Sequence, residues 1–138
     1  MDQRPEFGDK FLVGIEQIDR EHRKLFDIAG RTYDSLSASD AVGKALMQDA
    51  VAELIDYTAT HFASEEELMA AAGYPALEMH RDQHWHLLAR VRDMEMRVEF
   101  EDATVAVDLT HFLYRWLVEH IESSDHKFGD FVRARASS

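Results

Sequence analysis

The sequence predicts an all-α protein, an antiparallel up-down four-helix bundle with an N-terminal arm. Apolar residues recur at three- and four-residue steps in four stretches, which short polar segments join. The 138 residues include only two prolines and six glycines, a composition that favours helices over a β-sandwich or barrel. We expect one domain, divided into an arm at 1–17, the bundle at 18–132 and a C-terminal tail at 133–138.

The first predicted helix follows the arm, in which Phe7, Phe11 and Ile15 are placed to pack on the bundle. Asp19 is a residue type suited to the N-cap of this helix. The side chains expected on its buried face are Ile18, His22, Leu25, Phe26, Ala29, Tyr33 and Leu36.

The second and third helices are separated by the segment "AAGYPAL". Ser39 or Asp40 is expected to open the second helix, Gly73 to cap its end, and Pro75 to lie in the first turn of the third. The second stripe consists of Ala50, Leu54, Tyr57, His61, Glu65 and Leu68. The third consists of Leu77, His80, His84, Leu87, Leu88, Val91, Met94 and Val98.

The fourth helix follows the polar break "EFEDAT". Tyr114 lies within it, and we interpret this residue as a core or rim tyrosine rather than as part of a ligand pocket. The stripe of this helix consists of Val105, Leu109, Phe112, Leu113, Trp116, Leu117 and His120.

Each of the four stripes carries groups that are costly to bury in an apolar core. An unpaired buried carboxylate is especially unfavourable, so these groups are expected to share a partner. The pairs in "HFASE" and "HRDQH" have i,i+4 spacing, which places both donors on one face. Imidazole and carboxylate donors without sulfur suit iron, with manganese or zinc as alternatives. The candidate ligands are His22, His61, Glu65, His80, His84, His120 and Asp125.

The remaining histidines do not follow the stripes. His86 is about 200° around the helix from His84, and His111 is about 180° from His120. His126 directly follows Asp125 and is expected to point outward. We therefore place His86, His111 and His126 at the surface or rim.

Composition excludes several other classes of protein. The net charge of −12, from 15 basic and 27 acidic residues, disfavours a nucleic-acid partner or an anionic membrane surface. The absence of cysteine excludes disulfides, thiolate metal sites and thiol nucleophiles. No signal peptide is apparent, and no run of eighteen apolar residues predicts membrane insertion, so a cytoplasmic protein is expected.

Four blocks of this sequence resemble the signature blocks of the hemerythrin family, specifically its single-domain bacterial members. They are "VGIEQIDREHRKLF", "HFASEEELM", "GYPALEMHRDQH" and "WLVEHIESSDHKF", and they span nearly the whole chain. The resemblance implies an oxygen-bridged non-haem di-iron centre, built from two iron ions. His80, His84 and His120 would bind one iron and His22 and His61 the other, with Glu65 and Asp125 bridging the two.

The resemblance also implies reversible dioxygen binding, for oxygen storage, transport or delivery, at the iron with fewer protein ligands. This function is not enzymatic. Alternatives are a di-iron oxidase, peroxidase or nitric-oxide-handling enzyme, and an oxygen-sensing module. Five nitrogen donors against two carboxylates favour the carrier over carboxylate-rich oxidases. A monomer is expected, and the sequence does not identify an oxygen-consuming recipient protein. We interpret Glu66 and Glu67 as solvated neighbours of Glu65, because their directions turn away by about 100° each.

His120 and Asp125 are five residues apart, which corresponds to about 140° in a regular α-helix and would prevent both from facing one centre. Ser123 and Ser124 are weak helix formers whose hydroxyls compete for backbone hydrogen bonds. We therefore predict that the fourth helix kinks, widens by a π-type bulge or breaks between Ile121 and Asp125. Such a distortion would turn Asp125 toward the metal bound by His120.

Overall fold

The described part of the chain is helical and contains no strand. A computed structural model describes residues 6–34, 41–99, 108, 111–112 and 115–136. Three long helices come first: α1 (Glu16–Asp34), α2 (Ala41–Ala72) and α3 (Leu77–Glu99). Residues 115–119 are helical and lead into a π-helical segment, η3 (His120–Asp125), which continues as α5 (His126–Ala136).

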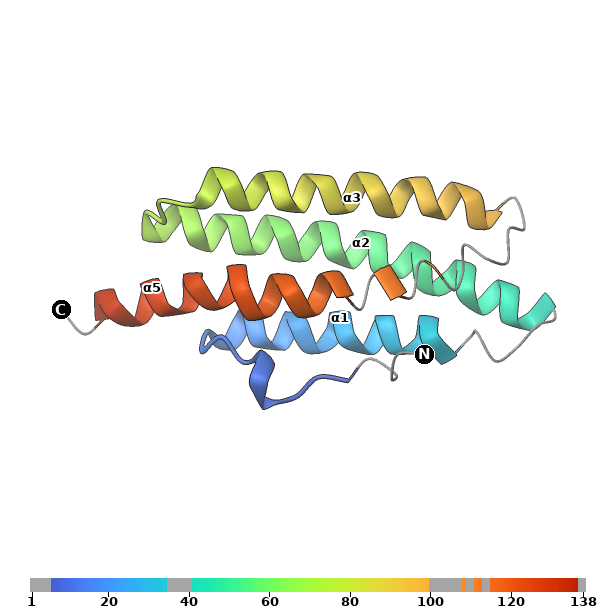
Figure 1. Ribbon diagram of the computed structural model, residues 1–138, viewed down its shortest axis with the longest axis horizontal. Coiled ribbons are helices and arrows are strands. Elements are labelled where there is room, and N and C mark those ends of the chain that lie inside the picture. Colours follow the sequence, from blue (N-terminus) through green and yellow to red (C-terminus); the bar gives the residue numbers. More distant parts are fainter. Residues whose placement is uncertain (1–5, 35–40, 100–107, 109–110, 113–114, 137–138) are drawn as a thin grey trace.

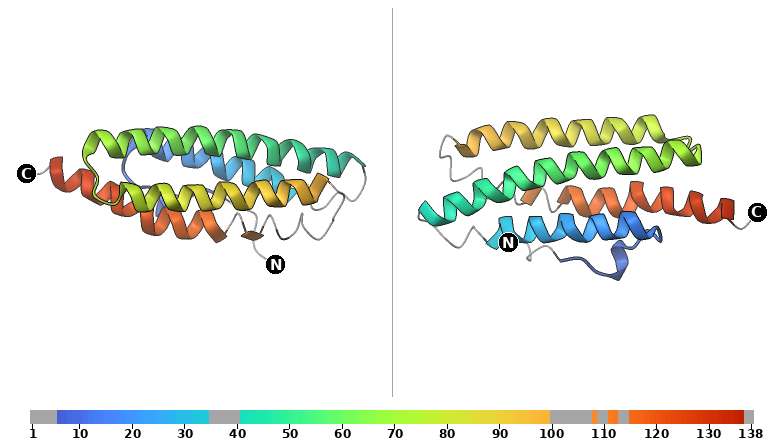
Figure 2. Two further views of the ribbon diagram at one scale, coloured as in Figure 1. Left: turned by 90° about the horizontal axis from the view of Figure 1, so that it is seen from above. Right: turned by 180° about the vertical axis from the view of Figure 1, so that it is seen from behind.

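The helices lie lengthwise beside one another, and the chain reverses direction from each to the next (Figure 1). The views from above and from behind show the same lengthwise arrangement, in which α2 packs against both α1 and α3 (Figure 2). The prediction of an antiparallel up-down four-helix bundle is confirmed. Among the described residues, no helix is both long enough and apolar enough to cross a membrane.

The four predicted stripes supply much of the core among the described residues, but Tyr33, predicted on the first stripe, is half-buried and lies outside it. Burial of these apolar side chains is the main favourable contribution to folding. Several of the expected residues are only partly buried at the edge of the core, namely Tyr57, Leu68, Leu77, Leu88, Phe112 and Trp116. The fully buried members include Ile18, Leu25, Phe26, Ala29, Leu54, Leu87, Val91, Met94 and Leu117. Some predictions lie outside the described residues, namely those for Leu36, Ser39, Asp40, Val105, Leu109, Leu113, Tyr114 and the side chain of Val98.

The start of the first helix differs from the prediction. Helix α1 begins at Glu16, so Asp19 lies inside its first turn and is not the N-cap. Its carboxylate instead accepts hydrogen bonds from the backbone N–H groups of Val13 (2.8 Å) and Gly14 (3.2 Å). A side chain that can cap a helix can equally satisfy the N–H groups of a preceding turn, because both need an anionic oxygen acceptor. Asp19 thus fixes the end of the N-terminal arm against α1.

The N-terminal arm packs through its aromatic residues. Phe7 and Phe11 contact Phe26 of α1, with ring centroids 5.6 Å and 4.8 Å from it. A short 3₁₀ turn, η1 (Asp9–Phe11), turns Phe11 into the core, where it is 2 % exposed. These contacts attach the arm to the bundle by apolar burial.

The connection from α2 to α3 follows the predicted glycine cap. Gly73 has a φ of +69°, and Tyr74 N–H donates to Met69 O while Gly73 N–H donates to Ala70 O. This is the Schellman pattern of a helix ending at a left-handed residue, and the prediction for Gly73 is confirmed. Pro75 lies in the turn before α3, which begins at Leu77. The prediction that Pro75 lies in the first turn of this helix was therefore wrong.

The fourth helix carries the distortion that the sequence predicts. Residues His120–Asp125 form a π-helix, in which His126 N–H donates to Ile121 O, five residues back. The wider turn contains one more residue than an α-helical turn, so residues five apart come onto the same side. The π-bulge prediction is confirmed. Helix α1 begins at Glu16 and α5 ends at Ala136, whereas the division of the chain at 17 and 132 remains a prediction.

Candidate metal centre

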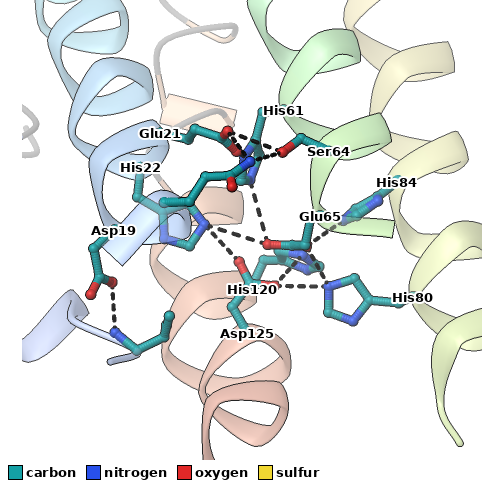
Figure 3. Close-up of polar contacts among 12 residues, drawn as sticks. Asp19, Glu21, His22, His61, Ser64, Glu65, His80, His84, His120 and Asp125 are labelled. Atoms are coloured by element: carbon teal, nitrogen blue, oxygen red, sulfur yellow. Dashed lines mark hydrogen bonds and ion pairs between the residues drawn. The ribbon is translucent and has the colours of Figure 1, made fainter. Parts of the chain in front are cut away.

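The seven candidate ligands lie together inside the bundle (Figure 3). Each of α1, α2, α3 and the fourth helix supplies at least one of these ligands, so the centre connects all four helices of the bundle. None is more than 7 % exposed, and His120 at 7 % is the most exposed. By element they are His22 from α1, His61 and Glu65 from α2, His80 and His84 from α3, and His120 and Asp125 from η3.

One group of donor atoms surrounds the first carboxylate oxygen of Glu65. Oε1 lies 2.9 Å from His80 Nε2 and 3.2 Å from His84 Nε2. His120 belongs to the same group, whose four ligand atoms all lie within 4.8 Å of one another. Three imidazoles and a carboxylate at this separation are able to hold one metal ion.

A second group shares Glu65 with the first. Its other oxygen, Oε2, lies 3.6 Å from His61 Nε2 and 3.9 Å from His22 Nε2. Asp125 completes this group, with Oδ2 placed 2.9 Å from His22 Nε2, and the four ligand atoms again lie within 4.8 Å of one another. This second group has two imidazoles where the first has three.

Asp125 spans the two groups in the same manner as Glu65. Its Oδ1 lies 2.8 Å from His80 Nε2 and 3.1 Å from His120 Nε2, whereas Oδ2 faces His22. Both carboxylates thus present one oxygen to each set of histidines. The π-helix makes this orientation available to Asp125, because it brings the residue back to the side of His120.

The donor set fits a pair of metal cations. Several of its buried atoms have no hydrogen-bond partner among the described residues, although they lie close together. Leaving such atoms unpaired in a protein interior costs free energy, which a shared cation would offset. Nitrogen and oxygen donors without sulfur suit iron, manganese or zinc. The atoms are His22 Nε2, His84 Nε2, His120 Nε2, Glu65 Oε2 and Asp125 Oδ2.

Both carboxylates are ionised in spite of their burial. Burial and the charge of Asp125 act to raise the pKa of Glu65, but the hydrogen bond with His80, the close approach of His84 and the attraction of His61 outweigh them and lower that pKa to about 2. Burial also acts to raise the pKa of Asp125, whereas the attraction of His120 and the hydrogen bond with His80 hold it well below its usual value. Two neighbouring anions thus need positive charge beside them.

In the metal-free chain, part of that charge resides on His80. Burial acts to lower its pKa, but its hydrogen bonds to Asp125 and Glu65 outweigh this effect and raise the pKa to about 9. A bound metal cation would take the place of this proton and be coordinated by the neutral imidazole.

Two glutamates that the sequence did not identify as part of the centre orient its histidines. Glu21 Oε1 lies 2.5 Å from His61 Nδ1, and Glu66 Oε2 lies 2.8 Å from His84 Nδ1. Fixing the second ring nitrogen sets the tautomer and direction of a metal-binding imidazole. The interpretation of Glu66 as a solvated neighbour was wrong. The step of about 100° along α2 that turns Glu66 away from the ligand groups directs its carboxylate to His84. Glu67 is exposed, as predicted.

Glu21 is itself held in place by α1 and α2. Gln17 Nε2 donates to its Oε2 at 3.3 Å, and the Ser64 hydroxyl donates to the same oxygen at 3.1 Å. Burial acts to raise the pKa of Glu21, but the hydrogen bond and attraction of His61, with the bonds from Gln17 and Ser64, lower it. Glu21 therefore remains an anionic acceptor for His61.

Aromatic rings also pack flat against two of the imidazoles, those of His84 and His120. Phe62 stacks on His84 with centroids 3.6 Å apart and planes within 3°. Trp116 stacks on His120 at 4.3 Å with planes 16° apart. These contacts restrict rotation of both rings, and for His84 they act together with the hydrogen bond to Glu66.

The three histidines assigned to the surface or rim stay outside both ligand groups. His86 is exposed, whereas His111 and His126 are half-buried. That prediction is confirmed.

The fold and site define a class of protein: a four-helix bundle with a buried pair of overlapping histidine–carboxylate groups. Comparisons with known proteins make the class specific. The family model described as "Hemerythrin HHE cation binding domain" matches residues 13–132. The chain therefore belongs to the hemerythrin family, whose members are non-haem di-iron proteins that bind dioxygen, and the resemblance noted in the sequence is confirmed.

Individual relatives are similar to this chain over most of its length. A bacteriohemerythrin of Stenotrophomonas maltophilia is 32 % identical over 126 residues, which cover 91 % of this chain and 80 % of the relative. A myohemerythrin of Riftia pachyptila is 32 % identical over 122 residues, which cover 88 % of each chain. A crystal structure of wild-type hemerythrin superposes with a TM-score of 0.76 at 28 % identity and covers 94 % of this chain and 95 % of that one.

Proposed function

We propose that this chain binds dioxygen reversibly at a non-haem di-iron centre. His80, His84 and His120 bind one iron, His22 and His61 bind the other, and Glu65 and Asp125 bridge them. The observation that carries this assignment is that each of the two carboxylates presents one oxygen to each set of histidines.

The asymmetry between the two groups supports the location of ligand binding. His80, His84 and His120 give one ion three nitrogen donors, whereas His22 and His61 give the other only two. The ion with fewer protein ligands retains an open position, as catalytic and ligand-binding metal sites do. When bound, iron supplies the electrons and the coordination position that dioxygen needs.

The surroundings of the donors favour reversible binding over net oxidation. All seven are buried, and Phe62 packs on the rings of His61 and His84. A hydrophobic shell limits the access of water and of co-substrates to a metal centre. Five nitrogen donors against two carboxylates also differ from the carboxylate-rich sites of di-iron oxidases. We therefore propose a carrier rather than an enzyme.

The test is a cycle of reduction, exposure to air and purging. The iron-loaded protein is reduced anaerobically, mixed with air and then flushed with inert gas while its visible absorption is recorded. A charge-transfer band that appears with air and disappears on purging supports the proposal. A Glu65→Gln variant is the control, because it should lose the paired centre. Irreversible formation of the ferric protein, with release of peroxide or consumption of a co-substrate, would support the enzyme alternative and refute the carrier.

A cytoplasmic location and a monomeric state are expected from the sequence, and an oxygen-consuming protein is the kind of recipient that a carrier would serve. An analytical ultracentrifugation run on the iron-loaded chain tests the monomer directly.

A further inference from the structure

An open pocket of about 650 Å³ lies against the candidate metal centre, beside the π-helix. Its wall includes Glu119 and Glu122, and the hydroxyl-bearing residues Ser123 and Ser124. His120 lines the same pocket. The pocket therefore connects a surface rich in oxygen donors with one of the proposed iron ligands.

His120 is the candidate ligand that this pocket shares with the buried centre. His120 lines the pocket, yet its Nε2 lies 3.1 Å from Asp125 Oδ1 and has no hydrogen-bond partner among the described residues. Its ring centroid is 4.7 Å from that of His80 and 5.2 Å from that of His84. His120 is also the most exposed of the seven candidate ligands. Figure 3 shows His120 beside Glu65, His80 and Asp125, so the ligand that lines the pocket belongs to the buried cluster.

The chemistry of the wall suits a hydrated divalent cation. Glu119 and Glu122 are exposed carboxylates, and Ser123 and Ser124 add hydroxyl oxygens to the wall. Carboxylates and neutral oxygens are the donors that replace the water shell of a hard divalent cation in steps. The excess of 12 negative charges on the chain adds long-range attraction for cations.

The same wall is a poor match for dioxygen, which is neutral and gains nothing from carboxylates. The pocket also opens on His120, a member of the group with three histidines. Under the proposed function, dioxygen binds at the other iron, near His22 and His61. The pocket therefore serves a different purpose from dioxygen entry.

We propose that this pocket is the route by which ferrous iron enters the bundle. Glu119 and Glu122 attract the cation, and His120 is the first buried donor that it meets. The π-helix has two consequences here: it turns Asp125 inward, and it places Glu122, Ser123 and Ser124 on the wall of the pocket. This inference rests on the proposed di-iron function, but it concerns the route into the site, not the site itself.

Iron uptake is measured by mixing metal-free protein with Fe²⁺ under anaerobic conditions. A Trp85→Phe background leaves Trp116 as the only tryptophan, since the chain has two. Trp116 stacks on His120, so its fluorescence reports iron reaching the floor of the pocket. Bound iron is counted separately with a colorimetric ferrous chelator.

The test variant is Glu119→Gln/Glu122→Gln, and the matched control is Asp56→Asn/Asp93→Asn. The control removes the same charge from exposed residues outside the pocket wall. At low ionic strength we expect Fe²⁺ uptake by the test variant to slow about tenfold, because nearby carboxylates raise the local concentration of cations at the pocket opening. Added salt should reduce this difference, and the final content of two irons should be unchanged in both variants.

Replacing Lys10 should change the rate of iron uptake in the opposite direction, because Lys10 pairs with Glu122 at 3.5 Å. Lys10→Gln should speed uptake, because it frees that carboxylate. Equal uptake rates for the test variant and the control would overturn the entry route, even with two irons bound at the end. If the parent chain never takes up two irons, the di-iron function itself fails, and the route fails with it.

Discussion

Replacing Glu21 tests whether the hydrogen bonds behind the histidines contribute to metal binding. Its carboxylate is 15 % exposed and lies 2.5 Å from Nδ1 of His61, which is 1 % exposed. Glu21→Gln keeps the shape and one acceptor oxygen but removes the negative charge. Glu21→Ala removes the acceptor and leaves the buried Nδ1–H of His61 without its partner. The two variants thus separate the effect of charge from the effect of the hydrogen bond.

The expected loss of metal affinity follows from the role of hydrogen-bond partners that orient metal-binding histidines. Removing a group that orients a metal-binding histidine weakens metal affinity by about 10- to 100-fold, which is roughly 1.4–2.7 kcal/mol. We expect Glu21→Gln near the lower limit and Glu21→Ala near the upper one. Only the iron held by His22 and His61 should be affected strongly, because Glu21 contacts His61. Glu66→Ala should weaken the other iron in the same way, through His84.

The assay is competition with a chelator of known affinity, resolved into the first and second iron. Glu16→Gln is the control, because Glu16 lies exposed on the same helix. If Glu21→Ala binds both irons as tightly as the parent, the hydrogen bond to His61 has no role in metal binding. If it weakens both irons to the same extent, the assignment of His61 to one side of the centre is wrong.

Three further predictions concern stability. Gly129→Ala should destabilise the protein by about 1–3 kcal/mol in urea unfolding, because the new Cβ would lie 2.2 Å from Val13 O. Gly8→Ala is the control, since nothing lies within 4 Å of a Cβ added there. Equal losses of stability in the two variants would contradict the close packing of Gly129 on Val13. Asp19→Ala should cost about 1–3 kcal/mol in the same assay, because two backbone N–H groups lose their acceptor; unchanged stability would refute this role. Removing iron with a chelator should lower the thermal unfolding midpoint, because metal binds the folded state; an unchanged midpoint would contradict a metal shared by all four helices.

The sequence predicts the arrangement of the bundle and the grouping of its inward-facing donors. Helical periodicity fixes which side chains share a face, so His61 with Glu65 and His80 with His84 could be paired from spacing alone. The step from His120 to Asp125 was informative because it broke that periodicity. A π-helix resolves the mismatch.

The parts that the sequence did not predict depend on contacts between helices. Glu21 directly precedes His22 but bonds His61, 40 residues away, and no local pattern marks such a partner. Asp19 has the side chain of an N-cap, yet it binds the turn before α1 because the arm folds back onto the bundle. Each of these roles depends on the packing of two segments, which residue type alone does not determine.

The paired metal centre is tested most directly by anomalous diffraction at the iron absorption edge, from crystals of the iron-loaded protein. The account predicts two iron peaks, one bound by His80, His84 and His120 and the other by His22 and His61, with Glu65 and Asp125 contacting both. A single iron peak, or a regular α-helix through residue 125 with the carboxylate of Asp125 turned to solvent, would contradict it.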